Sequence, residues 1–195
     1  MSNLCQEITL PTTPLQHIDD PNGEIALCIL SAINVGRINS DKELEDLCEL
    51  SVRGLEELID YQRYPVIAAE KSTKARRSLG IGFIGLAHYL AKLGYNYDSQ
   101  EAWDAVHGLT ESFQYFLLKT SNEIAKEKGK CSAFDRTKYS QGKLPIDHFK
   151  TDVNEITQQP LVHDWQSLRQ SILEHGLRHS TLSAQMPSES SSVVS

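Results

Sequence analysis

The sequence predicts a helix-rich α/β fold, and three kinds of stretch indicate it. Residues 24–35 (EIALCILSAINV) are almost all apolar and lie between two glycines, as expected of a strand that is buried on both faces. Segments with apolar residues at helical spacing follow this stretch. Residues 180–186 then alternate polar and apolar side chains up to a proline, which is typical of a half-buried strand. No repeat or low-complexity linker interrupts residues 1–195, so we expect one unit.

The composition fits a soluble globular protein and narrows the classes of partner. Of the 195 residues, 39% are hydrophobic and 23% are charged, which suffices for one sizeable core. The net charge of -7 disfavours nucleic acid as the main partner, because phosphate backbones bind basic surfaces. We expect the basic cluster of Lys71, Lys74, Arg76 and Arg77 to be a solvated helix entrance. No secretory signal or membrane-length apolar run occurs, so we expect a cytoplasmic protein without a membrane partner.

The first residues of the chain place an amide, a thiol and a carboxylate at alternating positions. In an extended segment, side chains at i, i+2 and i+4 point to the same side, so Asn3, Cys5 and Glu7 could face one small molecule. The pattern is short enough to occur by chance and does not establish a site by itself. Prolines and the turn-forming residues 19–23 follow, so we expect this segment to lie in a loop or at its end.

Capping residues and apolar stripes predict four helices. Ser40 and Glu43 form a capping box at the start of the first, and Asp164 caps the last. The expected helices cover residues 40–61, 77–92, 98–128 and 165–175. The residues expected on the buried face of the third helix are Trp103, Val106, Phe113, Phe116, Leu117 and Ile124.

Three glycines in the second predicted helix, Gly80, Gly82 and Gly85, give the pattern G-x-G-x-x-G. A dinucleotide-binding loop with this pattern follows a strand and has an acidic residue about 20 residues downstream. Neither feature is predicted here, so close packing of helices explains the glycines better.

The cysteines, at positions 5, 28, 48 and 131, include no Cys-x-x-Cys pair, which disfavours a zinc ribbon or a disulfide framework. Cys48 belongs to the apolar stripe of the first helix and Cys131 lies in an irregular connection, so both are expected to be structural. Cys28 is either a small core residue or a reactive thiol. His175 and His179 have helical spacing, but a glycine between them ends the helix, so no metal site is predicted.

The final segment combines the second predicted strand with a candidate anion site. Pro187 stops the strand, and the residues that follow at the expected start of a helix are Ser188, Glu189, Ser190, Ser191 and Ser192. Unpaired backbone N–H groups and the positive end of the helix dipole would suit a phosphate there. A solvent-exposed serine tail explains the same residues equally well on local grounds.

Together, these stretches resemble the large, catalytic subunit of class I ribonucleotide reductase. The runs SNLCQEI, GEIALCILSA and HSTLSAQMPSESSS occur in the order and spacing of that family, and the resemblance extends through RRSLGIG and GLAHYLAK over the whole chain. It implies part of the family's ten-stranded α/β barrel. Residues 1–23 would form its finger loop, and residues 24–195 the start of its second half-barrel with the phosphate loop.

The resemblance also implies roles for individual residues. Cys5 would become the thiyl radical that abstracts hydrogen from C3′ of the ribose. Asn3 and Glu7 would bind the substrate hydroxyls, with Glu7 as the general base on the 3′-OH while the 2′-OH leaves as water. Cys28 would be one of two redox-active cysteines that supply electrons and close into a disulfide. The residues that would hold the substrate diphosphate are Ser188, Glu189, Ser190 and Ser191.

The partners implied by the resemblance lie mostly outside the chain. The substrate would be a ribonucleoside diphosphate, reduced to its 2′-deoxy form for DNA synthesis. We expect no cofactor bound directly by this segment, because the radical would come from a separate, metal-containing small subunit. The electrons would come from thioredoxin or glutaredoxin, and the missing parts of the catalytic subunit would complete the barrel.

The chain also departs from the family pattern. The partner of Cys28 should come from an upstream half-barrel, and neither Cys48 nor Cys131 lies in a matching segment. The nucleotide-binding regulatory regions, the radical-relay tyrosines and a C-terminal cysteine pair are also absent, so we expect a partial subunit that is inactive alone. It is either an excerpt of a longer chain or a split-gene product that starts at Met1. The alternatives are a non-catalytic remnant that acts only as an assembly or binding module and, more weakly, a related enzyme that reduces triphosphates.

Overall fold

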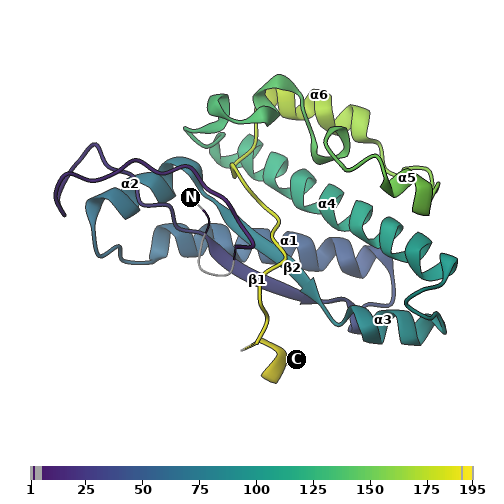
Figure 1. Cartoon of the computed structure of the whole chain (residues 1–195). Coiled ribbons are helices and arrows are strands. Elements are labelled where there is room, and N and C mark those ends of the chain that lie inside the picture. Colours follow the sequence, from purple (N-terminus) through teal and green to yellow (C-terminus); the bar gives the residue numbers. More distant parts are fainter. Residues whose placement is uncertain (1, 3–5, 190, 195) are drawn as a thin grey trace.

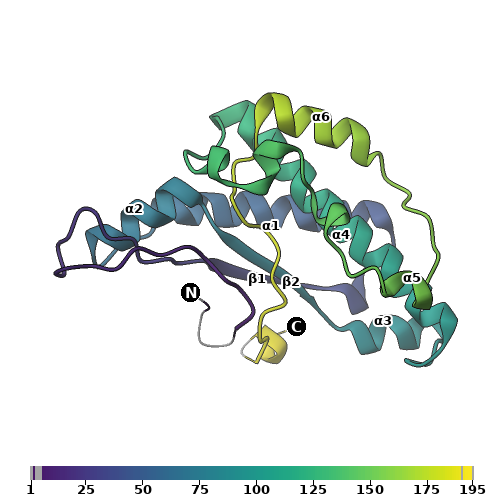
Figure 2. The ribbon, with the colours of Figure 1, turned by 45° about the horizontal axis from the view of Figure 1, so that its top comes forward.

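Helices cover one side of a small parallel sheet in the computed structural model, which describes residues 2, 6–189 and 191–194. In Figure 2, α1, α4 and α6 lie above the strands. The elements in chain order are β1 (Ile29–Asn34), α1 (Asp41–Tyr61), α2 (Ile67–Arg76), β2 (Leu79–Ile84), α3 (Leu86–Leu93), α4 (Gln100–Lys128), α5 (Val153–Ile156) and α6 (Trp165–His175). None of the helices in these ranges is both long enough and apolar enough to cross a membrane.

The strand β2 lies between β1 and a segment from the far end of the chain. β1 and β2 pair in parallel, from Ile29 opposite Leu79 to Asn34 opposite Ile84. On the other side of β2, residues 181–184 run parallel to it. The Leu79 amide donates to the Thr181 carbonyl at 2.9 Å, and the Ile81 amide donates to that of Leu182 at 2.8 Å. This edge segment is held by individual hydrogen bonds and one parallel bridge, from Ile81 to Ser183.

The predictions for α1, α4 and α6 are confirmed, and α1 and α6 begin at the capping residues that the sequence indicates. The Ser40 hydroxyl accepts from the Glu43 amide at 3.2 Å, and the Asp164 carboxylate accepts from the Ser167 amide at 2.9 Å. Glu43 completes the capping box one residue further out than expected, since its carboxylate accepts from the Asn39 amide at 2.9 Å. These ends depend on contacts within a few residues, which is why the sequence predicts them well.

The predicted helix over residues 77–92 is wrong. Its first half is the strand β2, and only its second half is helical, as α3. Gly80 and Gly82 therefore lie in a strand rather than between packed helices. The preceding helix α2 was not predicted, since its sequence IAAEKSTKAR has no continuous apolar stripe. Arg77 ends α2 in the left-handed conformation, with φ of 48°, and so turns the chain into β2.

The predicted strand over residues 24–35 is also too long. Regular pairing covers only residues 29–34, and residues 25–28 approach it as irregular backbone. Its faces are not both buried within this chain, because the Leu30 side chain remains 40% exposed. A strand buried on both faces needs covering layers on each side, and the helices here cover one side.

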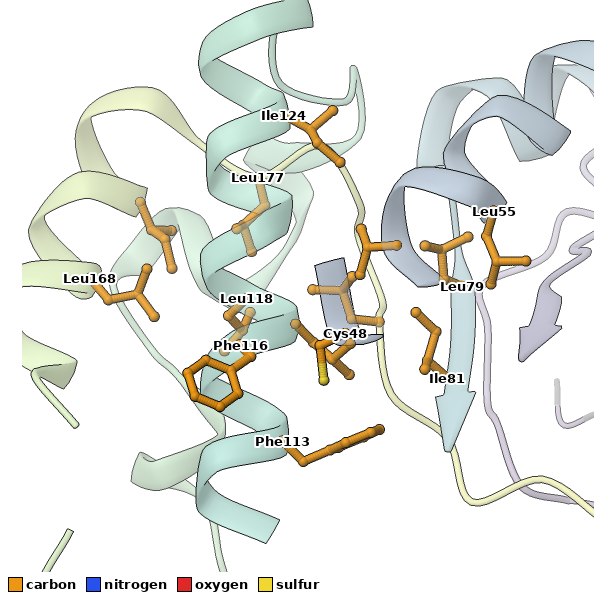
Figure 3. Packing of buried hydrophobic residues seen from close by; sticks show 14 of the residues in the cluster. Cys48, Leu55, Leu79, Ile81, Phe113, Phe116, Leu118, Ile124, Leu168 and Leu177 are labelled. Carbon is orange, nitrogen blue, oxygen red and sulfur yellow. The ribbon is translucent and has the colours of Figure 1, made fainter. Parts of the chain in front are cut away.

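The hydrophobic core lies between α1, α4 and β2. Figure 3 shows Cys48, Ile81, Phe113 and Leu118 among the side chains gathered there. Cys48 is fully buried, as predicted, and burial raises the pKa of its thiol to about 12. Cys131 is buried in the same cluster.

Most of the predicted buried face of α4 is confirmed, but its first turns are not. Phe113, Phe116, Leu117 and Ile124 are buried. Trp103 is 39% exposed and Val106 is only half-buried. Both side chains line an open hollow between α4 and residues 145–161 instead of packing into the main core.

The expectation of a solvated basic cluster is wrong for Arg76 and Arg77, which are both buried. Arg77 Nε donates to the Glu56 carboxylate at 2.7 Å, and Arg178 Nε donates to its other oxygen at 2.7 Å. His179 Nε2 donates to the same carboxylate at 3.0 Å. Burial alone would raise the pKa of Glu56, but these three donors outweigh it and lower the pKa to about 2.

We expect Glu56→Gln to lower the free energy of unfolding by about 3 kcal/mol or more, because the buried Arg77 and the partly buried Arg178 would lose this counter-charge. Denaturant unfolding would measure the change. Glu127→Gln is the matched control, since Glu127 also pairs with an arginine, Arg53, between α4 and α1, but at the surface. The control should be almost neutral. Equal effects of the two substitutions would contradict a dominant role for the buried carboxylate.

The ionised Glu56 carboxylate should also make the free energy of unfolding depend on pH. The pKa of Glu56 falls from its ordinary value of 4.5 to about 2 in the folded protein, so its ionised form stabilises the fold. This contribution is complete above about pH 4.5 and is lost as the pH falls toward 2. The unfolding free energy of the wild type should therefore drop more steeply across this range than that of Glu56→Gln, and parallel curves would contradict the prediction.

Candidate active site

Three segments that are far apart in the sequence meet in a small apolar cluster beside the sheet. Ile8 and Leu10 come from the N-terminal segment, and Ala184 comes from the segment beside β2. Ala26 and Cys28, from the approach to β1, pack against these three side chains. The three stretches that the sequence singled out therefore converge on one place.

Cys28 lies immediately before β1 rather than in the middle of a strand, and it is half-buried with a free thiol. Burial raises the pKa of this thiol, and the nearby Glu7 carboxylate raises it further. The thiol therefore stays protonated near neutral pH and does not act as a ready thiolate. Its environment suits a thiol that gives up hydrogen only when a reaction partner is in place.

Among the predicted catalytic residues, the structure places Glu7 close to Cys28. Asn3 and Cys5 lie outside the described residues. The expectation of an extended segment here is wrong at Gln6, which has φ of 60° in the left-handed region. Ser2 pairs with Thr9 in an antiparallel bridge, which closes the segment into a loop. The alternation of an extended strand therefore does not set the position of Glu7, because a left-handed residue precedes it.

The base of this N-terminal segment is fixed by a second bridge and an ion pair. Thr13 and Glu24 exchange backbone hydrogen bonds of 3.1 and 3.0 Å. The turn between them, predicted from residues 19–23, is held by Asp20, whose carboxylate accepts from the amides of Gln16 and Asn22 at 2.9 Å each.

An ion pair that the sequence analysis missed anchors this base to α2. Arg76 Nη2 donates to the Glu24 carboxylate at 2.6 Å, with both side chains largely buried. This hydrogen bond lowers the pKa of Glu24. The signal was present in the sequence, because Glu24 is the one charged residue in the apolar run EIALCILSAINV. A lone charge there indicates a buried partner.

The candidate phosphate loop follows Met186, which lies against β2. Where the sequence predicts the first turn of a helix, Ser191–Val193 form a single 3-10 turn. The Ser192 amide donates to the Ser188 carbonyl at 2.8 Å, and the Ser192 hydroxyl donates to the Glu189 carbonyl at 2.8 Å. Ser190 lies outside the described residues. One short turn has little macrodipole, so any anion binding here must come from individual amides and hydroxyls.

The remaining polar groups and hollows do not add a second catalytic cluster. Within the ranges that the structure describes, no three His, Cys, Asp or Glu side chains form a group that could hold a metal. His179 is a buried structural residue, bonded to Glu56 and Ser121. A hollow of about 830 Å³ lies between α4 and residues 145–161, and Trp103 and Phe149 line it. None of the predicted site residues that the structure describes lines this hollow.

Comparisons with known proteins agree in placing the chain in one family. The family model described as the barrel domain of ribonucleotide reductase matches residues 1–195. The chain is 58% identical to the ribonucleoside-diphosphate reductase subunit alpha of Haemophilus influenzae, covering 100% of the chain and 26% of that protein. It is 56% identical to the same-named subunit of Buchnera aphidicola from Schizaphis graminum, covering 100% of the chain and 25% of that relative. The ribonucleoside-diphosphate reductase 1 subunit alpha of Escherichia coli is 55% identical, with 100% and 26% covered. The chain thus spans about a quarter of the length of the curated relatives it matches.

We expect Glu7→Gln to speed the alkylation of Cys28, because loss of the nearby negative charge lowers the pKa of the thiol and leaves more thiolate at a given pH. Limited reaction with iodoacetamide, followed by mass spectrometry of the peptide that contains Cys28, measures the rate. Asp19→Asn is the control, since it removes an exposed carboxylate from the same loop. A rate that does not respond to Glu7→Gln would rule out the close approach of these two side chains.

Proposed function

This chain belongs to the ribonucleotide reductase family, and we propose that it forms the part of an alpha-subunit barrel in which ribonucleoside diphosphates are reduced to 2′-deoxyribonucleoside diphosphates. The observation that carries the proposal is the meeting of Ile8, Leu10, Cys28 and Ala184, which joins all three motif segments. Residues 1–195 would be one partial domain with a finger loop over residues 1–23. It would act in the cytoplasm to supply precursors of DNA.

The chemistry that we propose uses four groups of this chain to bind and activate the substrate, and Cys28 to reduce it. The radical form of Cys5 takes the hydrogen from C3′ of the ribose and later returns it. Glu7 accepts the proton of the 3′-OH, while Asn3 binds a substrate hydroxyl. The serine-rich loop, formed by Ser188, Glu189, Ser190 and Ser191, holds the diphosphate.

Cys28 and a second thiol, from a part of the barrel outside this chain, supply two electrons and two protons. The C2′–OH bond breaks, the hydroxyl leaves as water, a C–H bond forms at C2′, and the two thiols become a disulfide. The raised pKa of Cys28 supports this role, because a protonated thiol can give its proton to the departing hydroxyl. Thioredoxin or glutaredoxin then restores the thiols by exchange.

The radical itself has to come from elsewhere, and we assign it to a separate metal-containing subunit. The chain's own part is to hold the sugar, the diphosphate and the thiols of Cys5 and Cys28. Water and stray reductants would quench a thiyl radical, so the packing of Cys28 against the apolar cluster of Ile8, Leu10 and Ala184 favours this chemistry.

A chimera tests the proposal in a complete subunit. This chain replaces the corresponding quarter of the Haemophilus influenzae alpha subunit, with which it shares 58% identity, and CDP reduction is assayed with that organism's radical-supplying subunit. We expect turnover in the wild-type chimera, and a loss of about 100-fold or more with Cys28→Ser or Cys5→Ser. CDP binding should persist in both variants.

Cys48→Ala is the matched control, since it removes a thiol from the core. It should retain activity. An active Cys28→Ser chimera would refute the proposed redox role. A wild-type chimera that binds CDP but cannot reduce it would favour the alternative, an assembly or binding module.

A further inference from the structure

Two glycines interrupt the apolar strand β2, whose sequence is LGIGFI. A glycine inside a strand costs about 0.5–1 kcal/mol relative to alanine, and it often marks a close approach of another segment. Neither Gly80 nor Gly82 has a positive φ, so backbone freedom does not require glycine at these positions. The reason must be space.

Different kinds of atom lie close to the two glycines. A Cβ atom on Gly82 would lie 2.5 Å from the Ala184 carbonyl oxygen and 2.6 Å from the Met186 sulfur. A Cβ atom on Gly80 would lie 2.5 Å from Leu30 Cδ2, the end of a flexible side chain, and 3.3 Å from Ala184 Cβ. Backbone blocks the first position, whereas at the second the shortest contact is with a side chain that can rotate and the contact with Ala184 is only slightly tight.

The backbone that covers Gly82 leads directly into the candidate phosphate loop. Ala184 is fixed to β2 by its amide, which donates to the Ile81 carbonyl at 3.1 Å. The Gln185 side chain donates to the Phe83 carbonyl at 2.7 Å. Ala184 also belongs to the apolar cluster against which Cys28 packs. The same short segment therefore connects the loop at Ser188 with the surroundings of the redox thiol.

We propose that Gly82 is a positioning residue for the substrate diphosphate, acting through residues 184–186. This inference rests on the proposed function of the loop over residues 188–191. The missing side chain lets the segment lie against β2 and so sets the separation between the loop and Cys28. A methyl group at Gly82 pushes the Ala184 carbonyl from 2.5 Å to at least 3.4 Å, a displacement of about 1 Å. Misplacement by about 1 Å can cost an enzyme about 100-fold.

Three glycine-to-alanine variants of the chimera test this inference. In Gly82→Ala, the KM for CDP should rise about 10-fold or more. In Gly80→Ala, the rise should stay within about 3-fold, because Leu30 can move aside and Ala184 needs to shift by only a few tenths of an ångström. In Gly54→Ala, the KM for CDP and the kcat should both stay unchanged, since nothing lies within 4 Å of a Cβ atom at this position in α1.

The split between KM and kcat separates positioning from a merely structural role. A variant that is only less stable has fewer active molecules, so its apparent kcat falls while its KM stays the same. That result, or an unchanged KM, for Gly82→Ala would overturn the inference. If Gly82→Ala fails to fold, Gln185→Ala tests the inference instead. Gln185 is exposed, and its substitution removes a hydrogen bond that holds residues 184–186 to β2 without disturbing the core. We expect a rise of about 5-fold in KM, and no rise would overturn the inference.

The test of Gly82 does not depend on whether the chimera reduces CDP. A chimera that binds CDP without reducing it would refute the proposed function. The dissociation constant of CDP would then replace KM and would still report on Gly82. Conversely, normal turnover of the wild-type chimera with an unaltered KM in Gly82→Ala and Gln185→Ala would refute the inference and leave the proposed function intact.

Discussion

The arrangement of the sheet depends on the buried carboxylate of Glu56. This one side chain of α1 accepts hydrogen bonds from Arg77, from Arg178 and from His179. Arg77 lies just before β2, and the other two lie just before the segment that runs beside β2. His179 also contacts Ser121 of α4, at 2.9 Å from its Nδ1 atom. Removing a carboxylate from water is costly, and three donors compensate for the cost only if all of them are in place. The network therefore fixes where two neighbouring strands begin relative to the helices above them.

This constraint extends from the core to the candidate site. Because the segment over residues 180–186 begins at the Glu56 network, its register against β2 is already set when it reaches Gly82. A shift by one residue would move its apolar side chains to the opposite face of the sheet. Ala184 would then leave the apolar cluster around Cys28. A polar network in the core thus determines which side chains surround Cys28.

Local signals in the sequence predicted the helix ends and the fully buried Cys48, but they did not predict the features that assemble the site. Strand β2 was missed because its glycines fit it only in the presence of Ala184, about 100 residues later. The burial of Arg76 and Arg77 was missed because their counter-charges, Glu24 and Glu56, lie 52 and 21 residues away in the sequence. Cys28 and Glu7 were identified from motif order and resemblance, whereas the left-handed turn at Gln6 has no local signature. The missing information is long-range pairing, which periodicity and capping do not encode.

Cys28 differs from the other buried thiols in a way that matters for redox chemistry. Burial raises the pKa of both Cys28 and Cys48, so neither thiol is readily ionised. Cys48 is completely buried in the core, where no second thiol and no reductant could reach it without unfolding. Cys28 is half-buried beside a loop, so a partner thiol can approach it. Exchange requires a thiolate and access, whereas storage in the reduced state favours a protonated thiol. The half-buried position of Cys28 leaves its thiol accessible, while burial and the negative charge of Glu7 keep the thiol protonated.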